Sequence, residues 1–229
     1  MMDRSYVVCA VKPWNVAAFT RRTPALPGSW HLVETPDDLA LPWLEKISPR
    51  YIFFPHWSWR VPAELTERFE CVCFHMTDLP YGRGGSPLQN LIVRGHSSTV
   101  LSALQMVDEL DAGPIYLNHP LSLEGSAGEI FERAANLVYD LIGEIVTKQP
   151  NPNAQQGDAV VFPRRAPPES LLPQGGTPVA LYDFIRMLDA PTYPKAFLEW
   201  GEWRIDFDQA HTAGKFVEAH VTIRKKDRS

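Results

Sequence analysis

The sequence has little that would place the protein in a membrane or in an oxidising compartment. No apolar run approaches the roughly 18 to 20 residues that a membrane-spanning helix needs, and the N-terminus lacks the basic-then-apolar order of a signal peptide. Only three cysteines are present, an odd number that does not build a disulfide framework. We therefore expect a cytoplasmic protein with reduced thiols and no membrane partner.

The sequence also lacks an excess of charge of one sign. Its 22 basic and 27 acidic residues give a formal net charge of −5, which offers no electrostatic footprint for a nucleic-acid backbone or an anionic lipid surface. The 229 residues, 45% of them hydrophobic, exclude intrinsic disorder and fibrous architectures. The chain is long enough for one large domain or for one domain with an appendage.

Proline is present in excess, and it indicates how the chain is divided. Many of the 21 prolines lie between Pro150 and Pro178, together with several glycines. Upstream of this stretch short strands alternate with helices, whereas one helix and then period-two segments follow it. We predict an N-terminal domain over residues 1–149, a Pro-rich connector over 150–178 and a small C-terminal subdomain over 179–229 that consists of a helix and a β-hairpin.

Strand and helix signals alternate over the first 150 residues. Strands are predicted at 6–11, 30–34, 51–55, 70–75, 99–106 and 114–118, and helices from 15, 35, 62, 86 and 126. Thr35-Pro36-Asp37-Asp38 is typical of a helix start, and Ser126 with Glu129 forms a capping box ahead of an apolar helix face. Downstream, a helix is predicted over 178–188 and strands over 196–200, 202–207 and 215–223. The alternation predicts an α/β, Rossmann-like, open and mainly parallel sheet that binds ligands at the carboxyl ends of its strands.

The strand over 70–75 carries on one face three side chains that can act as metal ligands or take part in catalysis. Cys71, Cys73 and His75 share that face because strand side chains alternate with period two. Residues i and i+4 on a strand lie about 13 Å apart, too far to share a metal whose bonds are about 2.0 to 2.3 Å long, so we expect no metal site. Cys71 is interpreted as a core residue. His75 ends the strand before a glycine-rich loop, where it is either a general acid/base or a structural histidine.

Two loops in order resemble the signature of the folate-dependent formyltransferases. His75 is followed by Leu79-Pro80, Arg83-Gly84 and Pro87, and 36 residues after His75 comes Asp111 within Leu110-Asp111-Ala112-Gly113-Pro114-Ile115. The family pairs an H-x-S-L-L-P-x-x-R-G loop with a later D-x-G-x-I loop. Segments 162–165, 184–186 and 193–197 look like the region after the catalytic domain in amino-sugar and methionyl-tRNA formyltransferases. The resemblance implies that residues 1–149 are the catalytic domain and that N10-formyltetrahydrofolate gives its formyl group to a primary amine.

The resemblance also implies roles for individual residues. His75 corresponds to the general acid/base and Asp111 to the carboxylate that orients it, although an aspartate in an Asp-Ala-Gly turn is alternatively a turn-former. Cys73 occupies the position of the family's asparagine, which donates a hydrogen bond to the oxyanion, and a thiol is only a weak donor. His56 and Asn90 are candidates to replace that donor, with aromatic packing beside Trp57 as the alternative for His56.

Positions that match the family's formyl-donor contacts lie in three loops. They are Trp59, Arg60, Val61, Gly85, Val107, Asp108, Glu109 and Leu110. For Trp59 the alternative is ordinary aromatic packing. Arg83 either pairs with an anionic acceptor or locks the glycine-rich loop, and His56 is the other residue assigned to the acceptor.

The acceptor is predicted from the C-terminal part. Methionyl-tRNA formyltransferases carry a substantial basic C-terminal domain, whereas residues 179–229 alone follow the connector here. The Phe-Ile-Arg and Tyr-Pro-x-Ala-Phe segments resemble amino-sugar enzymes. We predict formylation of a nucleotide-linked amino sugar in surface-glycan biosynthesis, such as a pseudaminic-acid-type pathway. The alternatives are another small amine, formyltetrahydrofolate hydrolysis, and a catalytically impaired folate- or sugar-binding homologue that Cys73 favours. The C-terminal subdomain serves either acceptor binding or homodimer formation.

Overall fold

The computed structural model describes residues 4–212 and 214–226, which form two compact units. The first unit consists of Met1–Gly84, Thr99–Leu121 and Glu132–Val161, and the second of Gly85–Ser98, Ser122–Phe131 and Phe162–Ser229. Both units combine segments from distant parts of the chain. The predicted catalytic domain, connector and C-terminal subdomain are consecutive segments of the chain, and this functional division stays a prediction. In the described ranges no helix is long and apolar enough to cross a membrane.

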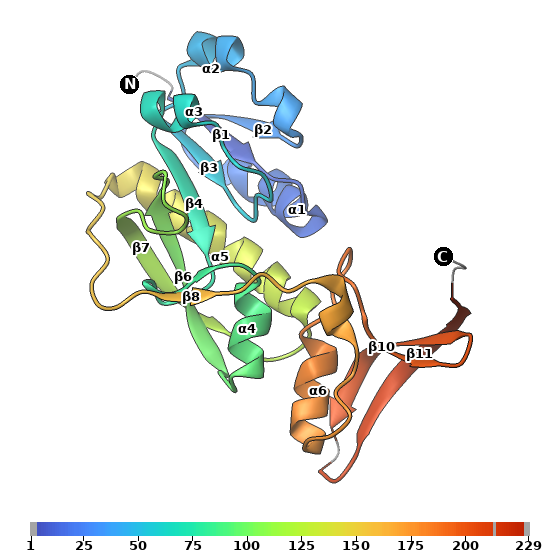
Figure 1. The fold of residues 1–229 in the computed structure, drawn as a ribbon. Coiled ribbons are helices and arrows are strands. Elements are labelled where there is room, and N and C mark those ends of the chain that lie inside the picture. Colours follow the sequence, from blue (N-terminus) through green and yellow to red (C-terminus); the bar gives the residue numbers. More distant parts are fainter. Residues whose placement is uncertain (1–3, 213, 227–229) are drawn as a thin grey trace. The chain divides into compact units, whose positions relative to one another are not determined.

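The first unit is built on a six-stranded sheet (Figure 1). Its strands follow the order β2-β1-β3-β4-β6-β7, with bounds β1 Ser5–Cys9, β2 Ser29–Val33, β3 Tyr51–Phe54, β4 Cys71–His75, β6 Ser98–Gln105 and β7 Ile115–Ser122. The four strands β1 to β4 are parallel, which confirms the predicted open, mainly parallel α/β sheet. Every residue of β3 is buried, as expected for a central strand covered on both faces.

The last two strands of this sheet form an antiparallel hairpin. β6 runs antiparallel to β4, with His75 opposite Ser102. Gln105 N donates to Pro114 O at one end of the hairpin, and Leu123 N donates to Ser97 O at the other. The predicted strands at 99–106 and 114–118 and the loop between them are therefore confirmed. Because β6 runs antiparallel to β4, the β6–β7 loop begins at the amino end of β4, where Met106 N donates to Cys71 O.

The helices follow the predictions except near Thr35. They are α1 Pro13–Arg22, α2 Leu41–Ile47, α3 Ala63–Arg68, α4 Pro87–Val93 and α5 Ala127–Lys148. Instead of one helix from Thr35, a 3₁₀ turn over Pro36–Asp38 precedes α2. The reason is Pro42, because a continuous helix would need its missing N–H to bond to Asp38 and would force its ring against that carbonyl. The capping box of α5 is confirmed, since Ser126 N donates to Glu129 Oε2 (2.7 Å) and Glu129 N to Ser126 Oγ (3.3 Å).

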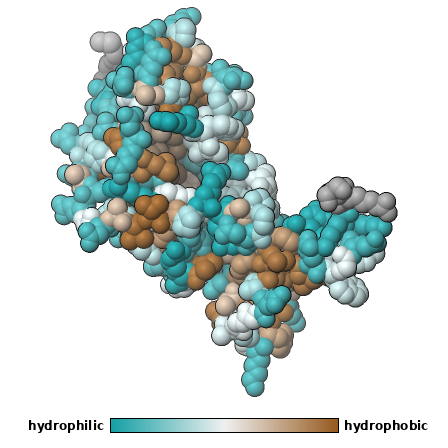
Figure 2. Space-filling view, in the orientation of Figure 1, coloured by the Kyte–Doolittle hydropathy of each residue, from teal (hydrophilic) through white to brown (hydrophobic). Residues whose placement is uncertain are grey.

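The second unit contains the C-terminal helix and a three-stranded antiparallel sheet. Its elements are α6 Pro178–Arg186, β9 Ala196–Trp200, β10 Trp203–Thr212 and β11 Val217–Lys225, with β10 in the middle. Trp200 pairs with Trp203 across a tight turn at Gly201, whose φ of +56° favours glycine. Figure 2 shows hydrophobic side chains at the surface over β10. Trp200 and Ile223 are among the exposed apolar residues of this sheet.

The connector is held to the first unit by backbone pairing. Asn153 and Ile115 exchange two backbone hydrogen bonds of 2.7 and 2.8 Å, and Val160 N donates to Pro80 O. The short strand β8 (Val160–Phe162) pairs with β5 (Tyr81–Gly84). From the sequence only a loop is expected at β5, because two glycines in four residues give no strand signal. The connector therefore contributes structure beside the glycine-rich loop.

Candidate active site

The candidate site begins at the end of β4. Because β4 alternates its side chains, Cys73 and His75 lie on the same face, and β4 ends at His75. Ser102 lies opposite His75 on β6 and donates its hydroxyl hydrogen to Thr77 O (2.9 Å). This bond fixes the first residues after the strand, so the turn that follows His75 has a defined shape.

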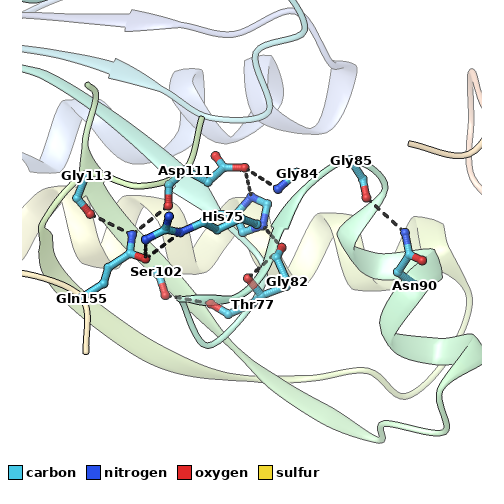
Figure 3. Close-up of polar contacts among 11 residues, drawn as sticks. His75, Thr77, Gly82, Gly84, Gly85, Asn90, Ser102, Asp111, Gly113 and Gln155 are labelled. Atoms are coloured by element: carbon cyan, nitrogen blue, oxygen red, sulfur yellow. Dashed lines mark hydrogen bonds and ion pairs between the residues drawn. The ribbon is translucent and has the colours of Figure 1, made fainter. Parts of the chain in front are cut away.

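Two contacts define how the His75 ring is oriented (Figure 3). Nε2 lies 2.7 Å from Gly82 O, and since a carbonyl oxygen only accepts, Nε2 must carry the hydrogen and donate it. Nδ1 then faces the carboxylate of Asp111, with 3.6 Å between Nδ1 and Oδ2. That separation is longer than a hydrogen bond. Nδ1 is thus the ring atom that is available to take up a proton, and Asp111 is the charge beside it.

Asp111 is held in a conformation that few residues adopt. Its φ of +54° is left-handed, a region in which aspartate is one of the better tolerated side chains. Its Oδ2 accepts a hydrogen bond from Gly84 N (2.9 Å), and Gly84 itself has a φ of +101°. A Cβ at Gly113 would lie 1.7 Å from Gln105 O, so the Asp-Ala-Gly turn requires glycine there. The loop therefore folds back to bring Asp111 to His75, as the resemblance implies.

Cys73 is the third residue of this cluster. Burial raises the pKa of its thiol well above the usual value, and the negative charge of Asp111 raises it further. The side chain therefore stays a neutral thiol at neutral pH and does not act as a nucleophilic thiolate. The alignment of Cys73 on the family's asparagine stays a prediction, and a thiol offers only a weak hydrogen-bond donor.

Of the two residues suggested as replacement donors, the structure rules out Asn90. Its Nδ2 donates to Gly85 O (3.1 Å), Ser86 O (3.1 Å) and Pro163 O (3.0 Å). The two amide hydrogens are fully used by these carbonyls, so none is left for an oxyanion. Asn90 instead anchors the start of α4 within the second unit, and its suggested role in oxyanion binding is wrong.

His56 follows β3 and is packed against an aromatic ring. Its ring meets that of Trp14 edge to face at 5.7 Å, and its φ of +54° is left-handed. Burial, and next the charge of Lys12, lower the pKa of His56 to about 4. The imidazole is therefore neutral at pH 7, when it has one N–H to donate. These contacts favour the packing alternative, and its assignment to the acceptor stays a prediction.

The pKa of His56 leads to a prediction about acid stability. The unfolded chain takes up a proton at this residue below about pH 6.5, whereas the folded chain does so only near pH 4. The free energy of unfolding should therefore fall as the pH drops from 6.5 to about 4. We expect His56→Asn, which suits the left-handed backbone, to make the melting temperature less sensitive to pH in this window. His211→Asn, at an exposed residue of β10, is the control. Identical pH profiles for wild type and His56→Asn would contradict the prediction.

Arg83 makes contacts that hold the glycine-rich loop. Its Nε and Nη2 both donate to Gln155 Oε1 (3.0 and 2.8 Å), and Nη1 donates to Glu109 Oε1 (2.9 Å). The guanidinium is therefore engaged on three of its nitrogens, which favours the loop-locking alternative over binding of an acceptor anion. Gln155 belongs to the Pro-rich connector and is not among the residues predicted from the sequence, because a lone glutamine there carries no recognisable signal.

The predicted formyl-donor residues differ in exposure. Val61 is buried, whereas Trp59 is 48% exposed and its ring lies edge to face with Trp57 at 5.0 Å. Arg60 is exposed, as is the run Val107, Asp108, Glu109 and Leu110, which forms one side of the loop that carries Asp111. Gly85 lies in the second unit, where a Cβ would come within 2.5 Å of Arg164, so packing alone explains this glycine. Donor binding by these residues stays a prediction.

No cluster of three or more His, Cys, Asp or Glu side chains able to hold a metal is found in the described part of the chain. The cluster at His75 brings together an imidazole, a carboxylate and backbone groups. Such a set can move protons between a nucleophile and a leaving group.

Comparison with known proteins shows which family this chain is similar to. Residues 167–224 match the family model for the methionyl-tRNA formyltransferase C-terminal domain. A methionyl-tRNA formyltransferase of Mesoplasma florum is 30% identical over 168 residues, which cover 69% of this chain and 53% of that protein. The solved methionyl-tRNA formyltransferase from Clostridium thermocellum is 40% identical, covers 97% of this chain and 100% of its own, and has a TM-score of 0.94.

The chain belongs to the formyltransferase family. It spans about half the length of the curated relative from Mesoplasma. Two more distant structures share the fold alone. HypX from Aquifex aeolicus, in complex with tetrahydrofolic acid, has a TM-score of 0.73, 15% identity and coverage of 90% of this chain and 37% of its own. A 4-N formyltransferase from Francisella tularensis has a TM-score of 0.68, 12% identity and coverage of 88% and 94%.

In this member of the formyltransferase family, the residues that the resemblance aligned on the two signature loops come together in space. His75 and Asp111 face one another although they are 36 residues apart in the chain. Cys73 remains the departure from the family pattern.

Proposed function

We propose that this formyltransferase moves the formyl group of N10-formyltetrahydrofolate to the primary amine of a nucleotide-linked amino sugar in surface-glycan biosynthesis. The observation that carries the proposal is the His75–Asp111 pair, in which a basic ring nitrogen faces a carboxylate fixed by Gly84 N. The three free cysteines are in keeping with a cytoplasmic location, where thiols stay reduced.

The reaction requires one proton to change place. The amine nitrogen forms a bond to the formyl carbon, an oxyanion develops, and the bond between that carbon and N10 of the folate then breaks. The amine loses a proton, and N10 gains one. His75 Nδ1 takes up the first proton, and the resulting imidazolium is stabilised by Asp111. The same nitrogen then returns a proton to N10, while the donated bond to Gly82 O keeps the ring in place.

A folate co-substrate fits the exposed residues around the cluster. Trp59, Val107 and Leu110 present exposed apolar surface that a pterin ring can cover, and Gly113 keeps the Asp111 loop in its shape. The Aquifex structure with tetrahydrofolic acid supports the assignment at the level of the fold. Arg60, Asp108 and Glu109 complete the proposed donor contacts.

Charge favours a small acceptor over tRNA. Residues 167–224, the segment that matches the tRNA-enzyme domain, contain five Lys or Arg against eight Asp or Glu. Most of those basic side chains are paired with acids, since Arg204 and Arg224 contact Asp206, and Lys195 contacts Asp189. A surface that neutralises RNA phosphates needs an excess of available positive charge. The 4-N formyltransferase of Francisella shares the fold over most of both chains and supports the small-acceptor proposal.

Methionyl-tRNA is the second candidate acceptor. It is favoured by the names of the Mesoplasma and Clostridium relatives and by the family match over residues 167–224. A role of the C-terminal sheet in acceptor binding or in dimer formation stays a prediction.

The test compares acceptors directly. The purified protein is first titrated calorimetrically with 5-formyltetrahydrofolate, and micromolar saturable binding is expected. N10-formyltetrahydrofolate turnover is then measured with nucleotide-linked 4-amino sugars, with methionyl-tRNA and without any amine. Turnover that depends on an amino sugar supports the proposal. Turnover only with methionyl-tRNA selects the second candidate, deformylation without amine indicates a hydrolase, and absence of donor binding leaves the binding-protein alternative.

Cys73→Asn distinguishes an impaired site from one built around the thiol. If the introduced amide reaches the position of the family's oxyanion donor, kcat should stay the same or rise by up to about 10²- to 10³-fold, the usual contribution of one such donor. The measurement is kcat of formyl transfer, with Cys71→Ala on the same strand as a packing control. Complete loss of activity in a folded Cys73→Asn protein would show that the site depends on the thiol.

A further inference from the structure

The Asp111 loop is strained and needs an external support. A non-glycine residue at a φ of +54° is conformationally unfavourable and persists when its surroundings determine it. The Gly84 N–H holds the carboxylate of Asp111, but it does not hold the main chain. The support of the main chain comes from a different part of the sequence.

That support is the side-chain amide of Gln155. Its Nε2 donates to Asp111 O (2.7 Å) and to Gly113 O (2.9 Å), so both of its hydrogens bond to the loop (Figure 3). Its Oε1 accepts two hydrogen bonds from Arg83. If the amide were flipped, its oxygen would face the two carbonyl oxygens and its NH₂ group would face the two Arg83 donors, so all four hydrogen bonds would be lost. The amide therefore has one orientation, and it joins the Asp111 loop to β5.

Gln155 is itself held close to the loop that it supports. Two residues earlier, Asn153 exchanges a pair of backbone hydrogen bonds with Ile115, just beyond the loop at the start of β7. The connector thus crosses the hairpin at a fixed register and delivers the Gln155 side chain to Asp111. Its neighbour Gln156 is exposed and provides a matched glutamine for comparison.

We infer that Gln155 is a positioning residue for formyl transfer, which places the Asp111 carboxylate against Nδ1 of His75. The inference rests on the proposed function for its kinetic consequence, since a displacement of a catalytic group by about 1 Å can cost about 10² in rate. Gln155 does not contact the reacting atoms; it acts through the main chain of Asp111.

Two variants separate this role from a simple anchor for Arg83. Gln155→Ala removes all four hydrogen bonds. Gln155→Glu retains an oxygen for Arg83 but turns a second oxygen toward the carbonyls of Asp111 and Gly113, which repel it. Both variants should lower kcat about tenfold to hundredfold with KM for the folate donor changed less than about threefold. Gln156→Ala should match the wild type.

A second readout needs neither donor nor acceptor. In protein labelled with ¹⁵N-histidine, the Nδ1 signal of His75 at pH 7 should move in Gln155→Ala and Gln155→Glu in the same direction as in Asp111→Asn, and stay unchanged in Gln156→Ala. If the wild type transfers no formyl group but the signal moves, the proposed function fails and the positioning role stands. Wild-type signals and wild-type kcat in both Gln155 variants, a loss confined to KM, or impairment of Gln155→Ala alone would overturn the inference. Melting temperatures identify a variant that fails to fold, in which case the other variant decides.

Discussion

Formyl transfer by His75→Asn is expected to be about 10²- to 10⁴-fold slower in kcat than by the wild-type protein. This is the usual contribution of a positioned general acid/base. The asparagine amide is too short to replace the 2.7 Å bond from Nε2 to Gly82 O, but the bond from Ser102 Oγ to Thr77 O still holds the turn after β4, so the fold should be kept. The amide has no atom that takes up a proton near pH 7. The measurement is kcat with the amino-sugar acceptor that the wild type prefers.

The control for His75→Asn is binding of 5-formyltetrahydrofolate. Its dissociation constant and the melting temperature should stay close to the wild-type values, because His75 is not among the proposed donor contacts. A variant that binds the folate and also turns over at the wild-type rate would show that His75 is structural. The proton would then have to be taken up by a different group, and the proposed mechanism would be wrong.

Asp111→Asn is expected to lower kcat by about 10² to 10⁴ without disturbing the loop. Asparagine tolerates the left-handed backbone, and its Oδ1 can accept the hydrogen bond from Gly84 N that Asp111 Oδ2 accepts in the wild type. The negative charge opposite His75 Nδ1 is lost, so the imidazolium formed during transfer is no longer stabilised. The effect should therefore appear in kcat, and the KM for the folate donor should change little.

Asp78→Asn is the matched control for the charge. Asp78 is exposed and lies three residues after His75, so this change removes one negative charge from the loop that follows β4 and leaves Asp111 in place. We expect Asp78→Asn to retain wild-type kcat. Equal losses in Asp78→Asn and Asp111→Asn would mean that overall charge, and not the carboxylate facing Nδ1, determines the rate.

The local features of the fold could be predicted because they depend on residues close together in the chain. The capping box of Ser126 and Glu129 and the buried stripe of α5 involve neighbours within one or two helical turns. The common face of Cys73 and His75 follows from the pleat of a single strand. The helix expected from Thr35 was wrong for an equally local reason, since Pro42 interrupts it before a second turn forms.

The pairing of His75 with Asp111 was available from sequence only through the resemblance to a family. Spacing alone does not show that a loop on an antiparallel hairpin folds back to β4, because that path depends on the register between β4 and β6. The resemblance also aligned Cys73 on the family's asparagine, and in the structure the charge of Asp111 helps to raise the pKa of its thiol. The resemblance could not show that the side-chain amide of Asn90 donates to three backbone carbonyls of the second unit.

The sequence by itself determined most of the helices and strands, the parallel core of the sheet and the residue types of the two signature loops. The tertiary structure alone decided which groups hold those loops in place. Gln155 lies 44 residues from Asp111 and 72 from Arg83, in a segment whose composition predicts only an extended connector. Hydrogen bonds over such separations depend on the pairing of the strands and on the register of the connector. No periodicity or motif near Gln155 encodes them, and for this reason the support of the candidate active site became visible only in the folded chain.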